Sequence, residues 1–153
     1  SANKNRDFYI TRDGITVPQA LGRTDLSFSP NVIIGNIFTY QPLENLQVSF
    51  LSKYVGKQFM SNFNSAISTN DVLDSFFTSD LNIVYEIKPK SVIKSVTFSA
   101  LVNNIFNKKY VDRGYYYTFD DTWSSPNVTT TVDGAGYYPQ ATRNFLIGAT
   151  LRF

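Results

Sequence analysis

The chain has 153 residues, which is enough for one ordinary domain with a hydrophobic core. It contains no cysteine and no histidine, so disulfide bridges, zinc-thiolate sites and histidine-dependent catalytic triads are excluded. The formal net charge is only +2, and the fourteen basic residues are scattered, which argues against a nucleic-acid surface. Aromatic residues make up 16% of the chain, a surplus that favours either a membrane interface or a stacking surface.

The first thirty residues are polar and are interrupted by turn-forming glycines and prolines. Residues 8–11 and 15–17 are rich in strand-forming side chains and flank a turn at Asp13-Gly14, which predicts a small hairpin. We therefore expect loop and edge-strand structure over residues 1–30.

Five later segments alternate apolar and polar residues with the period of two that is typical of a half-buried strand. These segments are residues 32–40, 46–54, 77–87, 96–103 and 145–153. Their connections are alternately short (41–45, 88–94) and long (60–75, 111–140). This pattern predicts an all-β fold, an antiparallel up-and-down meander, because an immunoglobulin-like sandwich would not sort its loop lengths by end. Short turns at one end and long loops at the other are typical of transmembrane β-barrels.

The last strand alternates most regularly. One face carries Phe145, Ile147, Ala149, Leu151 and Phe153, and the other face is mostly polar or small. Such a strand can close a soluble sandwich, or it can close an outer-membrane barrel whose apolar face meets lipid. The sorted loop lengths favour the barrel.

Three stretches resemble the C-terminal end of TonB-dependent outer-membrane receptors, particularly those of Bacteroidetes. They are the Asn-Asn-Ile-Phe-Asn-Lys-Lys-Tyr run at residues 103–110, the Tyr-Pro-Gln-Ala approach at residues 138–141, and the Leu-Arg-Phe ending at residues 151–153. Residues 28–30 and 52–59 also resemble this family, so the similarity extends over about residues 24 to 153, and the asparagine-rich run together with the terminal Phe153 is its specific part.

The resemblance implies a large plugged barrel in the bacterial outer membrane, of the kind that has 22 strands. Such receptors import iron chelates, cobalamin or similar scarce nutrients with energy from the TonB complex. Five long strands cannot close that barrel, so we expect residues 31–153 to be an incomplete set of C-terminal barrel strands. The plug domain and the TonB-contacting N-terminal part are then missing, and this chain alone should not transport.

The resemblance also implies partners. The terminal strand, with Phe153, would be recognised by the barrel-assembly machinery, and outer-membrane lipid would cover the apolar face. An isolated chain would expose that face to water, which predicts self-association or coverage by another part of the same chain. No cofactor and no nucleic-acid partner are expected.

The long segment over residues 111–140 is predicted to be an extracellular loop that meets the nutrient. Its candidate ligand-contacting residues are Tyr115, Tyr116, Tyr117, Trp123, Tyr137 and Tyr138, since aromatic rings can stack on a chelate or a sugar. The alternatives for these rings are an outer aromatic girdle or a loop core. Asp120, Asp121 and Asp133 lack the spacing of a known calcium loop, so we expect solvated carboxylates and no metal site.

Two other functions remain open from the residues alone. One is a complete small outer-membrane barrel of structural or adhesive type, although only five to seven strands can be found where eight would be needed. The other is a soluble carbohydrate-binding β module that uses the tyrosines. An enzyme is not expected, because no nucleophile with a base and no paired carboxylates can be assigned, and no catalytic residue is proposed.

Overall fold

The structure, a computed structural model, describes residues 3–11, 17–89 and 92–153. Within these residues the fold consists of β-strands and one short 3-10 helix, and every strand pair is antiparallel. The prediction of an all-β antiparallel fold is therefore confirmed. The chain divides into two compact units, one of residues 33–55, 76–109 and 141–153 and the other of residues 1–32, 56–75 and 110–140.

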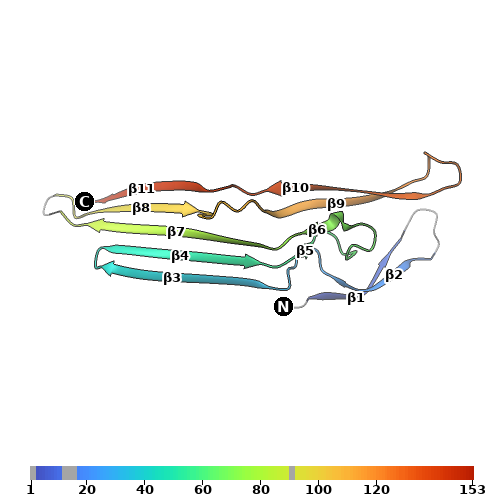
Figure 1. Cartoon of the computed structure of the whole chain (residues 1–153), viewed down its shortest axis with the longest axis horizontal. Helices are drawn as coiled ribbons and strands as arrows, with labels where there is room; N and C mark the ends of the chain where they lie inside the picture. The colour runs from blue at the N-terminus through green and yellow to red at the C-terminus, as the bar shows by residue number, and fades with distance from the viewer. Residues whose placement is uncertain (1–2, 12–16, 90–91) are drawn as a thin grey trace. The chain divides into compact units, whose positions relative to one another are not determined.

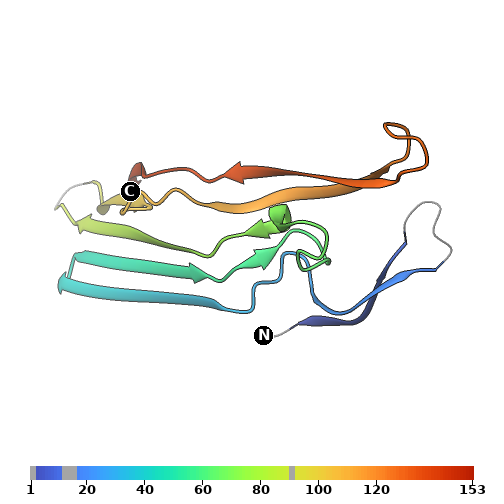
Figure 2. The same cartoon turned by 45° about the vertical axis from the view of Figure 1, so that its right-hand side comes forward.

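The unit of residues 33–55, 76–109 and 141–153 is one five-stranded sheet with the strand order β11-β8-β7-β4-β3 (Figure 1). Its strands are β3 (Ile33–Leu43), β4 (Leu46–Val55), β7 (Phe76–Ile87), β8 (Ser95–Asn103) and β11 (Asn144–Arg152). The same neighbours lie side by side in the turned view (Figure 2). Successive strands of the meander are thus neighbours in space, as the sequence predicts.

All five predicted strands are present, and each end lies within three residues of the predicted position. The first turn is shorter than expected, because residues 41–43 belong to β3 and only Glu44 and Asn45 form the turn. The predicted turn at residues 88–94 includes residues 90 and 91, which lie outside the described residues.

The register of the sheet determines which side chains share a face, because directly opposite residues point the same way. Phe38 lies opposite Phe50, Phe50 opposite Leu81, Leu81 opposite Val102, and Val102 opposite Phe145. A line of apolar side chains therefore crosses all five strands. Each strand alternates about this line, which gives the sheet two chemically different faces.

The unit of residues 1–32, 56–75 and 110–140 contains three two-stranded sheets and the 3-10 helix η1 (Thr69–Asp71). The strand pairs are β1 (Lys4–Ile10) with β2 (Gln19–Asp25), β5 (Gln58–Phe59) with β6 (Val72–Leu73), and β9 (Val111–Asp121) with β10 (Thr130–Pro139). Figure 1 shows β9 and β10 as a long hairpin.

Two predictions for this unit are corrected. The N-terminal hairpin exists, but its second strand is Gln19–Asp25 rather than residues 15–17, of which 15 and 16 lie outside the described residues. The long loop predicted over residues 111–140 is wrong: most of it forms β9 and β10, joined by residues 122–129. The segment of residues 60–75 is mainly loop, as predicted, with η1 and the short β6 inside it.

The interior of this unit is small and partly polar. Leu73 and Met60 are buried, and so is the Asp71 carboxylate. Asp71 accepts hydrogen bonds from the Ser61 hydroxyl and from the hydroxyl and backbone N–H of Ser65. A buried carboxylate needs such donors because transfer out of water is otherwise costly. These hydrogen bonds hold the loop of residues 61–71 in a compact conformation around the Asp71 side chain.

Candidate functional site

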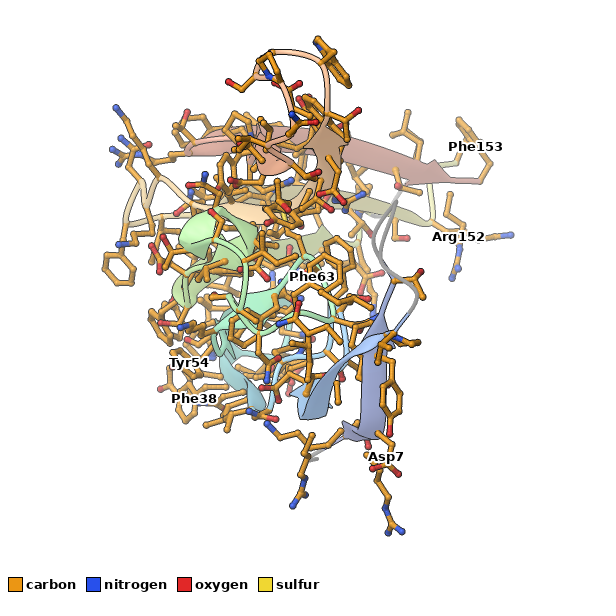
Figure 3. All side chains as sticks on the ribbon, turned by 90° about the vertical axis from the view of Figure 1, so that its right-hand side faces the viewer. Asp7, Phe38, Tyr54, Phe63, Arg152 and Phe153 are labelled. Carbon is orange, nitrogen blue, oxygen red and sulfur yellow. The ribbon has the colours of Figure 1, made fainter. Side chains whose placement is uncertain are left out.

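One face of the five-stranded sheet is mainly apolar, and we call it the apolar face. Its polar members are Asn36, Ser52 and Ser79, which lie in line across β3, β4 and β7. Its apolar members, set by the strand register, are Ile34, Phe38 and Tyr40 on β3; Leu46, Val48, Phe50 and Tyr54 on β4; Phe77, Leu81, Ile83, Tyr85 and Ile87 on β7; Val96, Phe98, Ala100 and Val102 on β8; and Phe145, Ile147, Ala149 and Leu151 on β11. Figure 3 shows Phe38 and Tyr54 on the same side of the sheet.

The apolar face is open rather than covered. Ile147 is 86% exposed, Phe145 67% and Phe38 64%. Coverage of this face by a second copy or by another part of the chain stays a prediction. A contiguous exposed apolar surface of this extent marks a contact with lipid or with another protein.

The opposite face, called here the polar face, carries most of the hydrogen-bonding and charged side chains of the sheet. Lys53, Glu86 and Arg152 all lie on it, together with Asn82 and Thr97. Apolar residues such as Ile37 and Leu51 are interspersed, so the alternation is less strict on β3 and β4. The sheet thus separates an apolar surface from a mixed, hydrated one.

Most aromatic side chains on the apolar face form two rows, each near one end of the strands, whereas Phe38 and Phe50 lie opposite each other between the rows. The first row contains Tyr54, Phe77 and Phe145. Tyr54 lies opposite Phe77, whereas Phe145 is displaced by four residues, since it aligns with Leu81 through Val102.

The second row contains Tyr40, Tyr85 and Phe98, and it continues in Phe153, which has the same parity as the apolar residues of β11. Tyr40 aligns with Ile83, Tyr85 lies two residues further along β7, and Phe153 lies four residues beyond Ala149, the partner of Phe98. From β3 to β11 this row is displaced by six residues over four strand steps, in the same direction as the first row.

Both rows are therefore inclined to the strands by a similar angle. A displacement of about 1.4 residues per strand, at about 3.4 Å per residue and 4.8 Å between strands, corresponds to an inclination of about 45°. The rows are separated by the eight residues from Phe77 to Tyr85, about 27 Å along the strand and about 19 Å perpendicular to the rows. Transmembrane barrels have strands tilted by roughly 35–45° and an apolar band of about 25 Å between aromatic girdles.

The asparagine-rich run after β8 ties two strands of the sheet together. Asn104 is buried with a positive φ of 51°, and its side chain bonds to Lys108 N and O and to the Ala141 carbonyl. Asn103 Nδ2 donates to Asn144 Oδ1 at 2.8 Å. Asn107, with a φ of 55°, accepts from Arg143 N at 3.1 Å. The run therefore fixes the start of β11 beside the end of β8.

The hairpin of β9 and β10 divides the six candidate ligand-contacting residues between two faces. One face carries Tyr115, Tyr117 and Tyr138, and the ladder register adds Phe119 to it. Trp123, beyond the end of β9, stacks on Phe119 with ring centroids 6.0 Å apart and planes 5° apart. We call these five side chains the aromatic ladder.

The rings of the aromatic ladder lie close to one another in two groups and are open to solvent. Tyr115 and Tyr117 stack with centroids 6.4 Å apart, and Tyr138 lies 6.2 Å from Tyr115. Trp123 is 71% exposed, and the other four rings are also exposed. Rings of this kind give a large, rigid contact area at a low cost in side-chain entropy.

Two glycines on β10 make room for these rings. A Cβ on Gly134 would lie 2.5 Å from Tyr117 Cζ, and a Cβ on Gly136 would lie 2.3 Å from Tyr115 Cε1. Each tyrosine therefore extends across the neighbouring strand and occupies the space that a side chain would fill. Glycine covered by a cross-strand aromatic ring is a recognised way to stabilise strand pairing.

The other face of the hairpin packs on residues 60–73 of the same unit. Tyr137 Oη donates to the Asn70 carbonyl at 2.7 Å, and Asn70 Nδ2 donates to Asp133 at 3.0 Å. Tyr116 packs edge-on against Phe63, with centroids 6.2 Å apart. Tyr116 and Tyr137 therefore help to hold the hairpin in place, although the Tyr137 side chain remains exposed. Ligand contact stays a prediction for all six rings.

Burial raises the pKa of the Tyr116 phenol, and the nearby carboxylates of Asp133 and Asp71 raise it further. Ser68 lies beside the phenol oxygen and opposes this shift. Among the described residues no hydrogen bond of normal geometry reaches the buried oxygen. The neutral phenol is thus the favoured form in this packed face.

Asp120, Asp121 and Asp133, the three aspartates considered as cation ligands, each accept hydrogen bonds from different groups of the protein. Asp120 accepts from the Thr131 hydroxyl at 2.7 Å, and Asp133 accepts from Asn70. Asp121 accepts from the backbone N–H groups of Trp123 and Ser124, and the hydrogen bonds from Ser124 hold the pKa of its carboxyl below the usual value. In the described part of the chain no group of three metal-ligating side chains converges.

Comparison with protein-family models, with curated proteins and with solved structures found no match for this chain. In the described ranges, no helix has the length and apolar character needed to cross a membrane.

Sequence reasoning found the apolar face and most of the aromatic ladder, but it missed Phe119, Gly134, Gly136 and Asp71 as functional or structural partners. A signal existed for the glycines, because Gly134-Ala135-Gly136 lies opposite the three consecutive tyrosines. For Asp71 there was no signal, since a buried carboxylate in a serine-rich loop looks like a solvated one.

Proposed function

We propose that this chain is the C-terminal part of the barrel of a TonB-dependent outer-membrane receptor of the Bacteroidetes type, which imports an iron chelate, cobalamin or a similar scarce nutrient. The observation that carries the proposal is the pair of inclined aromatic rows on the apolar face. Their inclination of about 45° agrees with the strand tilt of membrane-spanning barrels, roughly 35–45°, and the mainly apolar band of about 19 Å between them is somewhat narrower than the usual band of about 25 Å. The resemblance of residues 103–110 to such receptors supplies the family.

In this proposal the apolar face contacts lipid and the polar face lines the lumen. The edge strands β3 and β11 have no second partner strand among the described residues. Unpaired edges cannot face hydrocarbon, because each unsatisfied backbone group there costs several kcal/mol. Further strands of the parent receptor would pair with both edges and close the barrel.

Two parts of the chain would then have distinct roles. The strand β11, with Phe145, Ile147, Ala149 and Leu151 followed by Phe153, would be the signal for the barrel-assembly machinery. The β9–β10 hairpin, with its aromatic ladder, would lie outside the cell and contact the nutrient. TonB would act through the part of the receptor that precedes this chain.

Cysteine labelling tests the membrane assignment, because the chain contains no native cysteine. Single variants Ile83→Cys and Ala100→Cys place a thiol on the apolar face, and their neighbours Asn82→Cys and Ser99→Cys place it on the polar face. Each is labelled with a bimane fluorophore in outer-membrane vesicles from cells that make the protein. Nitroxide-bearing lipids should quench the label at residues 83 and 100 and leave the label at residues 82 and 99 bright.

Equal quenching at neighbouring positions, or recovery of the protein in the soluble fraction, would overturn the proposal. A soluble carbohydrate-binding module is the second candidate, and the exposed aromatic ladder is the observation that favours it. Such a module would stay monomeric without detergent. The outer-membrane proposal predicts instead that the detergent-free chain self-associates through its apolar face, which sedimentation velocity measures.

A further inference from the structure

The β9–β10 hairpin borders a cavity of about 380 Å³ within the unit of residues 1–32, 56–75 and 110–140. Thr118, Asp120 and Thr131 line it from the hairpin face opposite the aromatic ladder. Tyr9 and Thr11 line it from β1 and the residue that follows, and Phe63 lines it from the loop. We call it the Asp120 cavity. Its volume lies at the lower end of the range for small-molecule sites, which suits one ring-sized group.

One wall of the cavity is an aromatic ring held in place by its neighbours. Phe63 lies 6.1 Å from Phe8 and 6.2 Å from Tyr116, centroid to centroid. Figure 3 shows Phe63 among the side chains of this unit. A ring fixed between two others is a preorganised platform, so little entropy is lost when a ligand packs on it. The negative face of such a ring attracts weakly positive C–H bonds or a cation.

The polar lining is made of hydroxyls and one carboxylate. Asp120 accepts a hydrogen bond from Thr131 Oγ1, which orients the carboxylate. An ionised carboxylate only accepts, so the ligand must donate to it, whereas threonine hydroxyls both donate and accept. No lysine or arginine lines the cavity among the described residues. Acidic side chains also outnumber basic ones in this unit, nine to six by sequence, so an anionic ligand is disfavoured.

We propose that the Asp120 cavity binds one neutral sugar unit of a saccharide. Hydroxyls of the sugar donate to Asp120 and exchange hydrogen bonds with Thr11 and Thr118, while the C–H face of its ring packs on Phe63. This assignment stands on the cavity alone and does not rest on the proposed receptor function.

The test uses the whole chain in detergent. Neutral methyl glycosides of glucose, galactose and mannose are the probes, with choline as the cationic and methyl glucuronide as the anionic comparison. Saturation-transfer NMR detects binding, and titration calorimetry gives the affinity. We expect at least one neutral glycoside to bind and methyl glucuronide not to bind.

Variants locate the binding in the cavity. Asp120→Asn keeps the size of the side chain and should weaken binding about tenfold, since hydrogen bonds to charged groups contribute more than neutral ones. Thr131→Val should weaken it several-fold by releasing Asp120. Tyr138→Ala, which alters the aromatic ladder on the other face, should leave it unchanged.

Three results would overturn the inference: no neutral glycoside binds, binding ignores Asp120→Asn, or choline binds more tightly than every glycoside. Each result is independent of the cysteine-labelling pattern. Sugar binding with failed membrane labelling would uphold this site and defeat the receptor proposal, and the reverse pattern would do the opposite.

Discussion

The Asn104 side chain and the backbone of Lys108 form a reciprocal pair of hydrogen bonds: Asn104 Nδ2 donates to the Lys108 carbonyl at 2.8 Å, and Lys108 N donates to Asn104 Oδ1 at 2.9 Å. A second acceptor, the Ala141 carbonyl, lies 3.3 Å from the same Nδ2. One buried amide thus satisfies backbone groups that approach from two parts of the chain. The run of residues 103–110, which carries the resemblance to the receptor family, therefore stabilises the connection between β8 and β11.

Replacement of Asn104 should destabilise the sheet more than replacement of Asn107. Asn104→Gly keeps the left-handed backbone but removes three hydrogen bonds, at a cost of about 2–3 kcal/mol. Asn104→Ala adds backbone strain of about 1 kcal/mol, because alanine tolerates a positive φ poorly. Asn107→Gly removes a single exposed bond and should cost less than about 1 kcal/mol. Urea unfolding of the chain in detergent measures the order, and equal costs at residues 104 and 107 would contradict it.

The glycines of β10 should determine the aromatic ladder. In Gly134→Ala and Gly136→Ala the new Cβ would meet Tyr117 or Tyr115 at 2.5 Å or less, so the ring must move away from the strand. The near-ultraviolet circular dichroism of the stacked tyrosines should fall. Gly35→Ala is the matched control, since nothing lies within 4 Å of its added Cβ. An unchanged spectrum in both β10 variants would show that the rings do not depend on these glycines.

Removal of the Asp71 carboxylate should open the loop of residues 61–71. Asp71→Ala leaves the Ser61 and Ser65 donors unpaired in a buried site, which costs roughly 2–4 kcal/mol. Limited proteolysis should then cut the loop faster. Asp74→Ala, at an exposed position three residues away, provides the comparison and should leave the rate of cutting unchanged. Equal protection in both variants would remove Asp71 as the organiser of this loop.

Tyr116 should make the stability of its unit fall at high pH. Because its pKa is raised in the folded state, the folded chain holds the phenolic proton more tightly than the unfolded chain. The stabilisation is complete below the ordinary tyrosine pKa of about 10 and is lost as pH rises through the folded-state value. Tyr116→Phe should remove this loss and, by deleting an unpaired buried hydroxyl, should not destabilise the chain at pH 7. Unfolding free energies at pH 8 and pH 11 test both statements.

The strands of the five-stranded sheet could be predicted because their side chains differ sharply between the two faces. In β7, for example, Leu81, Ile83 and Tyr85 alternate with Asp80, Asn82 and Glu86, and such a period identifies a strand without tertiary information. The ends of the strands were harder to predict where turn-forming residues continue the strand, as at residues 41–43 at the end of β3.

The β9–β10 hairpin escaped prediction because its strands violate that rule. Three consecutive tyrosines place rings on both faces of β9, and β10 contains Asp133 and two glycines, which are poor strand formers. Its pairing is stabilised by Tyr115 and Tyr117 lying across the glycines, a contact between residues about twenty positions apart. The division of the candidate rings into an open face and a packed face follows from this pairing, and no local pattern contains it.

In the hairpin, the glycines of β10 determine where the rings of Tyr115 and Tyr117 lie, but they do not determine which aromatic residue supplies each ring. Gly134 and Gly136 provide the space, while the tyrosines opposite them make no hydrogen bond through that contact. A ring could therefore be exchanged for phenylalanine or tryptophan with the backbone unchanged. This freedom makes the hairpin a surface on which selection, or an engineer, can alter ligand preference one ring at a time without refolding the scaffold.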